Sequence, residues 1–350
     1  MDFKKVKINI NPATDKSLYD DIADLECFFG DNIDNFPYNF YTEDLPTESI
    51  LLISTFKDIR NFYNFDKDKF LNFLKYNKIL LLAEFDLELQ WQGEKDLYGK
   101  NDFYSTLNVA NLHRISDNPY SNADIVVKSK FLTLTDNFGI NLINQKKQDS
   151  NGKFFCLMNA NRDHRNRVIN SLYNKNLLSN GKVVYHQCKE EHIKDLLHKQ
   201  KKFEDLVGFN IPPYSWLDGQ LGREYLEYAL ELIVETTSNF IFITEKTVRP
   251  LSAGMPFLMV SAPKTLQYLR DIGFQTYNNY IDESYDDELD LDKRIDLVTD
   301  LLSTISKDNL IDIRNKTKDM QYHNLENLLK INLNYRAEYI EKVYNFIKTL

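Results

Sequence analysis

Two stretches of the sequence place cations where a bound anion would be stabilised. The first, "NANRDHR" at residues 159–165, follows an apolar run and contains Asn159, Arg162 and Arg165. If the run is a strand and a helix follows, these side chains lie beside free backbone N–H groups at a positive helix N-terminus. Arginine suits phosphate because its planar guanidinium donates two hydrogen bonds at once. The stretch predicts an anion site, with an ordinary charged first turn as the alternative.

The second stretch, residues 235–249, carries polar side chains at both ends of an apolar run. They are Glu235, Thr244, Glu245, Lys246 and Arg249. Thr244 is predicted to be a helix N-cap, and Glu245 in the first turn suits the helix dipole. Lys246 is unfavourable there by a few tenths of a kcal/mol unless an anion lies between it and the helix. Pro250 cannot donate to the Lys246 carbonyl, which predicts a kink or a delayed helix start.

A third candidate, Glu84, follows the apolar run "KILLLAEF" at residues 78–85. A carboxylate at the carboxyl end of a strand could accept the proton of a hydroxyl nucleophile. General base catalysis of this kind contributes about 10²–10⁴-fold to a rate. Asp86 and Glu88 compete for the same role, and a solvated strand end explains all three carboxylates equally well.

Several other kinds of site are not expected. Neither a GxGxxG nor a GxxxxGK[ST] motif occurs. The six histidines are scattered without a metal-ligand pair at i and i+4, so neither a metal nor a resident cofactor is expected. The acidic stretch at residues 281–294 contains DxD-like triplets, but a solvated loop leading into the acidic start of a helix is the favoured interpretation.

The elements that would position these residues alternate between strands and helices. In the first half, strands are predicted within residues 6–10, 48–55, 78–85 and 123–129, with an amphipathic helix at 64–77. In the second half, strands are predicted within 153–158, 182–186, 227–236, 239–244, 255–260 and 274–277, and helices within 164–178, 190–203 and 263–273. This alternation indicates an α/β protein with two Rossmann-like domains facing across a cleft.

The polar segment at residues 144–153 marks the expected domain boundary. We expect a first domain over 1–148 and a second domain over 149–330. A terminal helix over 331–350 would return to the first domain. Ligands of parallel α/β sheets bind beyond the carboxyl ends of the strands, where both cation-bearing stretches begin.

The two stretches resemble the donor-binding motifs of the α-1,3-fucosyltransferase family, over roughly residues 153–175 and 230–265. Asn159 and Arg165 have the six-residue spacing of the first motif, and Glu235 precedes "ITEK" at the spacing of the second. "GMPFLMVSAP" at 254–263 falls where the family has a proline, an apolar strand and a turn. Three positions depart from the family pattern and leave the donor's base and sugar open. They are Met158 for serine, Thr236 for asparagine and Phe242 for tyrosine.

The resemblance implies the GT-B type, with an acceptor-side domain over 1–148 and a nucleotide-sugar-binding domain over 149–330. It also implies a metal-independent, inverting glycosyltransferase that moves a sugar, fucose among the candidates, from a nucleoside-diphosphate donor to a hydroxyl acceptor such as a glycan. Arg165 and Lys246 would contact the diphosphate. Glu235 would hold a ribose hydroxyl, Glu245 would approach the sugar or ribose, and Glu84 would be the base. The remaining predicted donor-site residues are Asn159, Arg162, Thr244 and Arg249.

Composition limits the alternatives. The 350 residues are 43% hydrophobic and 27% charged, and no apolar run approaches the roughly 18 residues that span a bilayer. Three widely separated cysteines fit a reduced, cytoplasmic setting. The net charge of −9 disfavours a phage-type enzyme that glycosylates a DNA base, which stays an alternative. A noncatalytic nucleotide- or sugar-phosphate-binding protein is another alternative.

Overall fold

The structure is a computed structural model of the whole chain. The described residues are 8–10, 38–40, 50–53, 78–82, 112–116, 125–126, 128, 132, 153–197, 226–305, 307–347 and 349. The chain divides into two compact units, one of residues 1–128 with 334–350 and one of residues 129–333. The predicted boundary near 148 lies outside the described residues.

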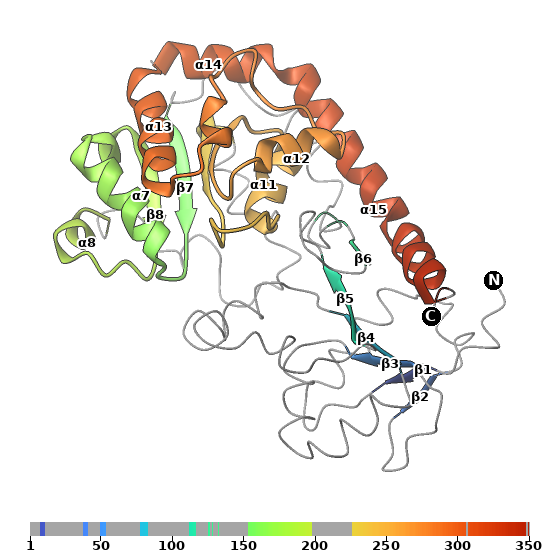
Figure 1. Ribbon diagram of the computed structural model, residues 1–350. Coiled ribbons are helices and arrows are strands. Elements are labelled where there is room, and N and C mark those ends of the chain that lie inside the picture. Colours follow the sequence, from blue (N-terminus) through green and yellow to red (C-terminus); the bar gives the residue numbers. More distant parts are fainter. Residues whose placement is uncertain are drawn as a thin grey trace. The chain divides into compact units, whose positions relative to one another are not determined.

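The first unit contains a parallel sheet (Figure 1). Its strands are β1 (Ile8–Ile10), β2 (Tyr38–Phe40), β3 (Ile50–Ile53), β4 (Lys78–Leu82), β5 (Leu112–Ser116) and β6 (Ile125–Val126), in the order β2-β1-β3-β4-β5-β6. Strands β1, β3, β4 and β6 confirm the four predicted strands of this half. Strands β2 and β5 were not predicted, because "YNF" and "LHRIS" are too short and too polar to show an apolar run.

The long helix α15 (Lys318–Ile347) contributes to both units, because the division falls between residues 333 and 334. Within the first unit, the Lys342 ammonium donates to the Val126 carbonyl at 2.7 Å, and Lys128 pairs with Glu338 at 2.8 Å. The end of this helix is therefore held at the last strand of the first sheet. None of the described helices is both long and apolar enough to cross a membrane.

The second unit is built on a four-stranded parallel sheet in the order β10-β9-β7-β8. Its strands are β7 (Phe154–Met158), β8 (Gly181–Tyr185), β9 (Leu230–Val234) and β10 (Phe257–Val260). Strands β7, β9 and β10 are buried along their whole length. Parallel strands covered on both faces have this continuous burial, which is why they appear in the sequence as apolar runs rather than as alternating patterns.

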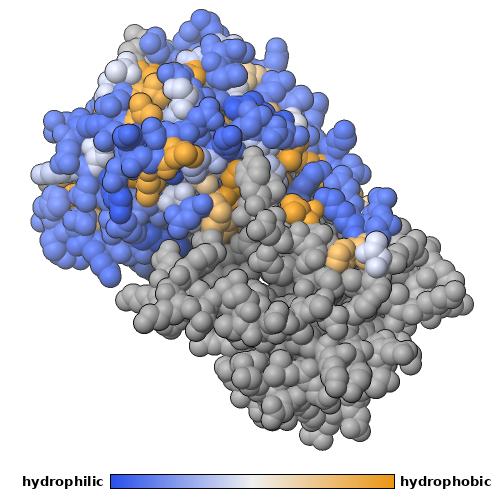
Figure 2. Space-filling model, in the orientation of Figure 1, coloured by the Kyte–Doolittle hydropathy of each residue, from blue (hydrophilic) through white to orange (hydrophobic). Residues whose placement is uncertain are grey.

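Helices and short 3₁₀ turns connect and follow these strands. They are α7 (Asp163–Asn174), η3 (Leu177–Ser179), α8 (Glu191–Leu197), α11 (Glu245–Ala253), α12 (Thr265–Asp271), η5 (Ser284–Asp287), α13 (Leu291–Thr304) and α14 (Lys307–Lys316). Helix α13 packs against α7 and β10, whereas α11 contacts β9 (Figure 1). On the visible face, hydrophilic residues dominate the surface of the described residues (Figure 2).

The strand order contains a topological switch point at the carboxyl ends of β7 and β9. From β7 the chain steps to β8 on one side, whereas from β9 it steps to β10 on the other side. Because parallel crossovers are right-handed, the helices that follow β7 and β9 cover opposite faces of the sheet. The two loops are left next to each other at the strand ends, which is where ligands bind in such sheets. Both cation-bearing stretches start at this switch point.

Two of the predicted strands are wrong. Residues 239–244 and 274–277 form loops without ladder hydrogen bonds, although Ile241, Phe242 and Ile243 are buried. The backbone of the second loop is satisfied by side chains instead, because Asn324 of α15 bonds both the N–H and the carbonyl of Gln275. A short apolar run can thus be buried without joining a sheet. The α/β class with parallel sheets is confirmed, whereas the predicted helix at 64–77 lies outside the described residues.

Candidate functional site

The loops that follow β7 and β9 are joined by side chains from the first turn of α7. His164 lies 2.9 Å through its Nε2 from the carbonyl oxygen of Glu235, and Arg165 donates to the same oxygen at 3.3 Å. Seventy residues separate Arg165 from Glu235 in the sequence. The two predicted stretches are therefore brought together at the switch point.

Arg165 is a buried cation whose described hydrogen-bond partners are uncharged. Arg165 is only 2% exposed to solvent. Its guanidinium donates to the carbonyl oxygen of Ala160, at 2.9 Å, and to that of Glu235. Its Nε has no hydrogen-bond partner among the described residues. Burial and the neighbouring Arg162 lower its pKa, although a guanidinium stays charged. A buried charge without a paired anion is costly, so a bound anion would stabilise this site.

His164 is held neutral by its surroundings. It is buried, and burial is the main reason why its pKa falls to about 4, with the Arg165 charge adding to the effect. A neutral imidazole with its proton on Nε2 donates to the Glu235 carbonyl. His164 therefore fixes the loop after β9 without adding positive charge to the site.

This depressed pKa predicts a pH-dependent stability. The unfolded state binds a proton near pH 6.5 that the folded state does not bind until pH 4, so the free energy of unfolding falls as pH decreases through this window. The full loss at pH 4 is about 3 kcal/mol, at about 1.4 kcal/mol per pKa unit. Urea unfolding at pH 7 and pH 5 measures it. His164→Gln keeps the donor and should flatten the slope over this interval, and an unchanged slope would contradict the assignment.

Glu235 directly follows β9, and its carboxylate organises the turn into α11. The residue is fully buried and accepts four hydrogen bonds from its own chain. The donors are the backbone N–H groups of Thr236 and Thr244 and the hydroxyls of Thr244 and Thr247, at 2.6 to 3.1 Å. A carboxylate offers about four acceptor positions, so a ribose hydroxyl would have to replace one of these donors.

The start of α11 confirms the predicted N-cap. Thr244 has an extended backbone, and its hydroxyl accepts from the backbone N–H of Lys246 at 3.3 Å. The helix begins at Glu245, so Pro250 does not delay its start but lies inside the helix. Proline removes the i+4 donor of the Lys246 carbonyl. Left-handed Gly254 ends the helix in a Schellman motif.

Lys246 is mostly buried and makes two described contacts. Its ammonium donates to Glu245 Oε1 at 2.5 Å and to the Thr236 hydroxyl at 3.1 Å. Burial by itself would raise the pKa of the Glu245 carboxyl, but the charges of Lys246 and Arg249 outweigh burial and hold it below its usual value. Glu245 also acts on Arg165 as a favourable charge, so these groups share one site.

Arg249, predicted as a further donor-site cation, is buried in the second unit. It is 5% exposed and pairs at 3.5 Å with Glu231, the second residue of β9. Sequence reasoning missed Glu231, although an acid inside an otherwise apolar strand is the signal that could have found it. A buried ion pair of this kind accounts for the Arg249 charge without a ligand.

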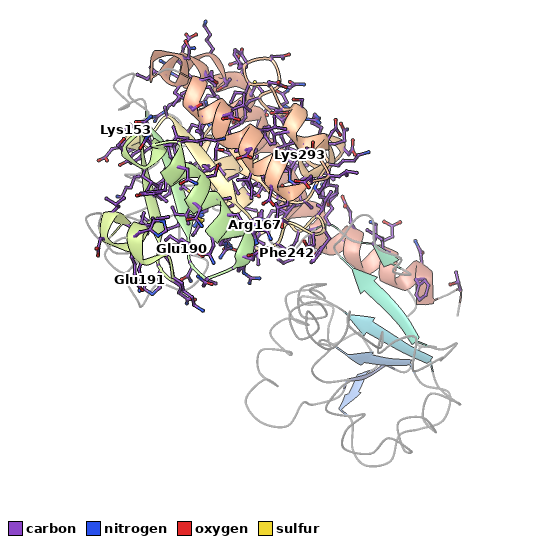
Figure 3. All side chains as sticks on the ribbon, turned by 60° about the vertical axis from the view of Figure 1, so that its left-hand side comes forward. Lys153, Arg167, Glu190, Glu191, Phe242 and Lys293 are labelled. Carbon is purple, nitrogen blue, oxygen red and sulfur yellow. The ribbon has the colours of Figure 1, made fainter. Side chains whose placement is uncertain are left out.

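Asn159 and Arg162 lie at the carboxyl end of β7. Asn159 is exposed, and its carbonyl accepts from the N–H of Gln187; the backbone N–H of Arg162 donates to the Tyr185 hydroxyl. A polar network lies beside them and includes Asn161 of the same polar turn. Its other members, missed from the sequence, are Asn166, Tyr185 and Gln187. Figure 3 shows Arg167 and Phe242 toward one end of this unit and Lys153, which precedes β7, toward the other.

The acidic stretch at 281–294 caps two helices. The expected acidic helix start is present at Asp290, whereas Asp286 is buried and not part of a solvated loop. Asp286 accepts from the N–H groups of Leu266 and Gln267, and Asp290 accepts from that of Lys293 at the start of α13. Among the described residues, no group of three or more histidine, cysteine or acidic side chains could hold a metal ion. Glu84, Asp86 and Glu88 lie outside the described residues, so the structure does not place the predicted base.

Similar proteins were found among solved structures. No protein-family model and no curated protein matches the sequence. The chain is similar to a crystal structure of an alpha1,3-fucosyltransferase, with a TM-score of 0.47 and 10% identity over 95% of this chain and 90% of that chain. It is also similar to alpha1,3-fucosyltransferase with GDP-fucose (TM-score 0.43, 9% identity, 88% and 81% covered) and with GDP (0.42, 11%, 95% and 90%). These structures belong to the family that the two motifs resemble.

Proposed function

We propose that the protein is an inverting, metal-independent glycosyltransferase with a nucleoside-diphosphate-sugar donor and a hydroxyl acceptor, a glycan in the first instance. The buried Arg165 carries this proposal, because its described partners are neutral and it lies at the switch point of a parallel sheet. Lys246, in the first turn of α11, adds a second cation. The motif resemblance supports a GDP-linked, fucose-like donor and the two-domain GT-B arrangement with its donor domain over 149–330.

In this mechanism the donor's diphosphate binds between Arg165 and Lys246. The N-termini of α7 and α11 add their partial positive charge. As the bond from the anomeric carbon to the diphosphate breaks, negative charge develops on the leaving oxygen. Fixed cations stabilise this negative charge. In other enzymes, removing one hydrogen-bond donor to such a charge lowers kcat by about 10²–10³-fold. These cations would take the place of a divalent metal.

Glu84 is proposed as the base, with Asp86 and Glu88 as its rivals. The acceptor oxygen forms a bond to the anomeric carbon on the face opposite the diphosphate and gives its proton to the carboxylate. The nucleoside diphosphate leaves with the electron pair of the broken bond, and the configuration at the anomeric carbon inverts. The base contributes because a hydroxyl is a poor nucleophile until its proton is removed.

A binding panel tests the donor site. Thermal unfolding is measured with GDP, UDP, CDP, ADP and dTDP, each with and without EDTA. A bound nucleotide at a hundredfold excess over its Kd should stabilise the folded protein by about 2.7 kcal/mol. We expect one nucleotide, with GDP the first candidate, to raise the Tm equally in both conditions. If none of the five shifts the Tm, the donor-site proposal is wrong.

Turnover separates an enzyme from a noncatalytic binding protein. Nucleotide-sugars that contain the nucleotide found to bind are incubated with the protein and with candidate hydroxyl acceptors. Release of the nucleoside diphosphate is then measured. An enzyme releases it and a binding protein does not.

A further inference from the structure

Lys246 is paired with an anion of its own chain, and that anion is the neighbouring residue Glu245. The ammonium contacts Glu245 Oε1 at 2.5 Å, and the two side chains are only 11% and 19% exposed. A second contact, to the Thr236 hydroxyl at 3.1 Å, ties the ammonium to the loop after β9. One acidic and one neutral oxygen thus hold this cation.

This pairing is not dictated by the helix. Side chains at i and i+1 of an α-helix point in different directions and do not face each other. The Glu235 carboxylate, which also lies at this turn, is fully engaged by its four donors. Glu245 is therefore the described carboxylate that compensates Lys246, at a helix N-terminus where a lone cation is unfavourable.

We propose that Glu245 is the resident counterion of Lys246 and that the diphosphate of the donor displaces it. On binding, the ammonium keeps its contact with Thr236 and exchanges the Glu245 carboxylate for a phosphate oxygen. Glu245 then competes with the ligand for one cation. This inference rests on the proposed function, because it assumes that the site takes a diphosphate.

The charges around Glu245 make the exchange costly. Arg165 from α7 and Arg249 from its own helix attract the Glu245 carboxylate, but its hydrogen-bonded cation is Lys246. A diphosphate adds further negative charge to the same small region. Because Glu245 loses its closest partner when the ligand binds, part of the binding free energy is spent on leaving a mostly buried carboxylate less well paired. Removing the carboxylate should therefore strengthen binding.

Inorganic pyrophosphate is the probe that isolates this effect. It carries the diphosphate charge but has no ribose, base or sugar, so it cannot report a contact between Glu245 and those groups. Its Kd is measured by titration calorimetry without divalent metal, for the full chain and for Glu245→Gln. The variant keeps the shape of the side chain and removes its charge. We expect the Kd to fall by about tenfold, which corresponds to about 1.4 kcal/mol.

Glu191→Gln is the matched control. Glu191 is also in the first turn of a helix, α8, and pairs with a lysine, Lys194, at 2.9 Å, and its replacement changes the net charge by the same amount. Figure 3 shows Glu191 on this helix. The Kd of the Glu191→Gln variant for pyrophosphate should stay within twofold of that of the unaltered chain. Glu245→Ala serves as a second variant and should shift the Kd in the same direction as Glu245→Gln.

A double variant tests whether the effect passes through Lys246. In a Lys246→Gln background, Glu245→Gln has no cation to release, so its effect on the Kd should shrink to less than twofold. Full tightening in that background would overturn the inference, as would equal or weaker pyrophosphate binding in both folded Glu245 variants. If these variants and the unaltered chain all bind neither pyrophosphate nor any of the five nucleotides, the proposed function fails as well. Binding by the unaltered chain without tightening in the variants overturns the counterion inference alone.

Discussion

Arg165→Gln should lower kcat for sugar transfer by about 10²–10³-fold, the effect seen when one preorganised donor to a developing negative charge is removed. The guanidinium is fixed by two backbone carbonyl oxygens and has no anionic hydrogen-bond partner among the described residues, so its charge is available to a ligand. Release of nucleoside diphosphate from the donor that binds in the thermal panel measures the effect. Arg165→Lys keeps the charge but loses the planar fork, so it should recover only part of the rate.

Stability separates a ligand-binding role for Arg165 from a structural one. Removing a buried cation that lacks a paired anion relieves a desolvation cost, so the free energy of unfolding should change little although the rate collapses. Arg167→Gln is the control on the same helix, because Arg167 is exposed and pairs with Asp163 and Asp292. Its rate should stay within twofold of the unaltered enzyme. A turnover of Arg165→Gln close to that of the unaltered enzyme would remove Arg165 from catalysis.

Glu235→Gln should lower the free energy of unfolding by about 2–4 kcal/mol. The carboxylate accepts four hydrogen bonds in a fully buried position, two of them from the backbone N–H groups of Thr236 and Thr244. A glutamine replaces one oxygen by an NH₂ group, which faces at least one of these N–H groups as a second donor. Each buried group left without a partner costs about 1–3 kcal/mol. Urea unfolding at pH 7, above the range in which His164 titrates, measures the loss.

Thr247→Val is the matched control for Glu235→Gln. It removes one hydroxyl donor to the same carboxylate and keeps the shape of the side chain. Because three donors remain, the loss should be about 1 kcal/mol, and at most that of a single bond to a charged group. If Glu235→Gln cost no more than Thr247→Val, the carboxylate would not be the group that holds this turn.

The local elements of the second unit could be predicted because each has a strong local cause. The apolar runs before Asn159 and Glu235 became β7 and β9, since parallel strands are buried on both faces. Thr244 became the N-cap of α11 because its hydroxyl can accept from a free N–H of the first turn. The failures at 239–244 and 274–277 arise because side chains bond that backbone in place of a neighbouring strand. Glu235, nine residues away, accepts from the Thr244 N–H, whereas Asn324, from the distant helix α15, accepts from the Gln275 N–H.

By itself, the sequence determined the α/β class, the two cation-bearing stretches and the motifs that they resemble. The tertiary structure decided which of the charges are available. Arg165 and Arg249 were both candidates along the chain, but Arg249 meets a carboxylate within the core, whereas Arg165 meets backbone carbonyl oxygens. The physical reason is that the energy of a buried charge depends on the groups that surround it in space, and those groups come from strands about seventy residues apart that meet only when the sheet forms.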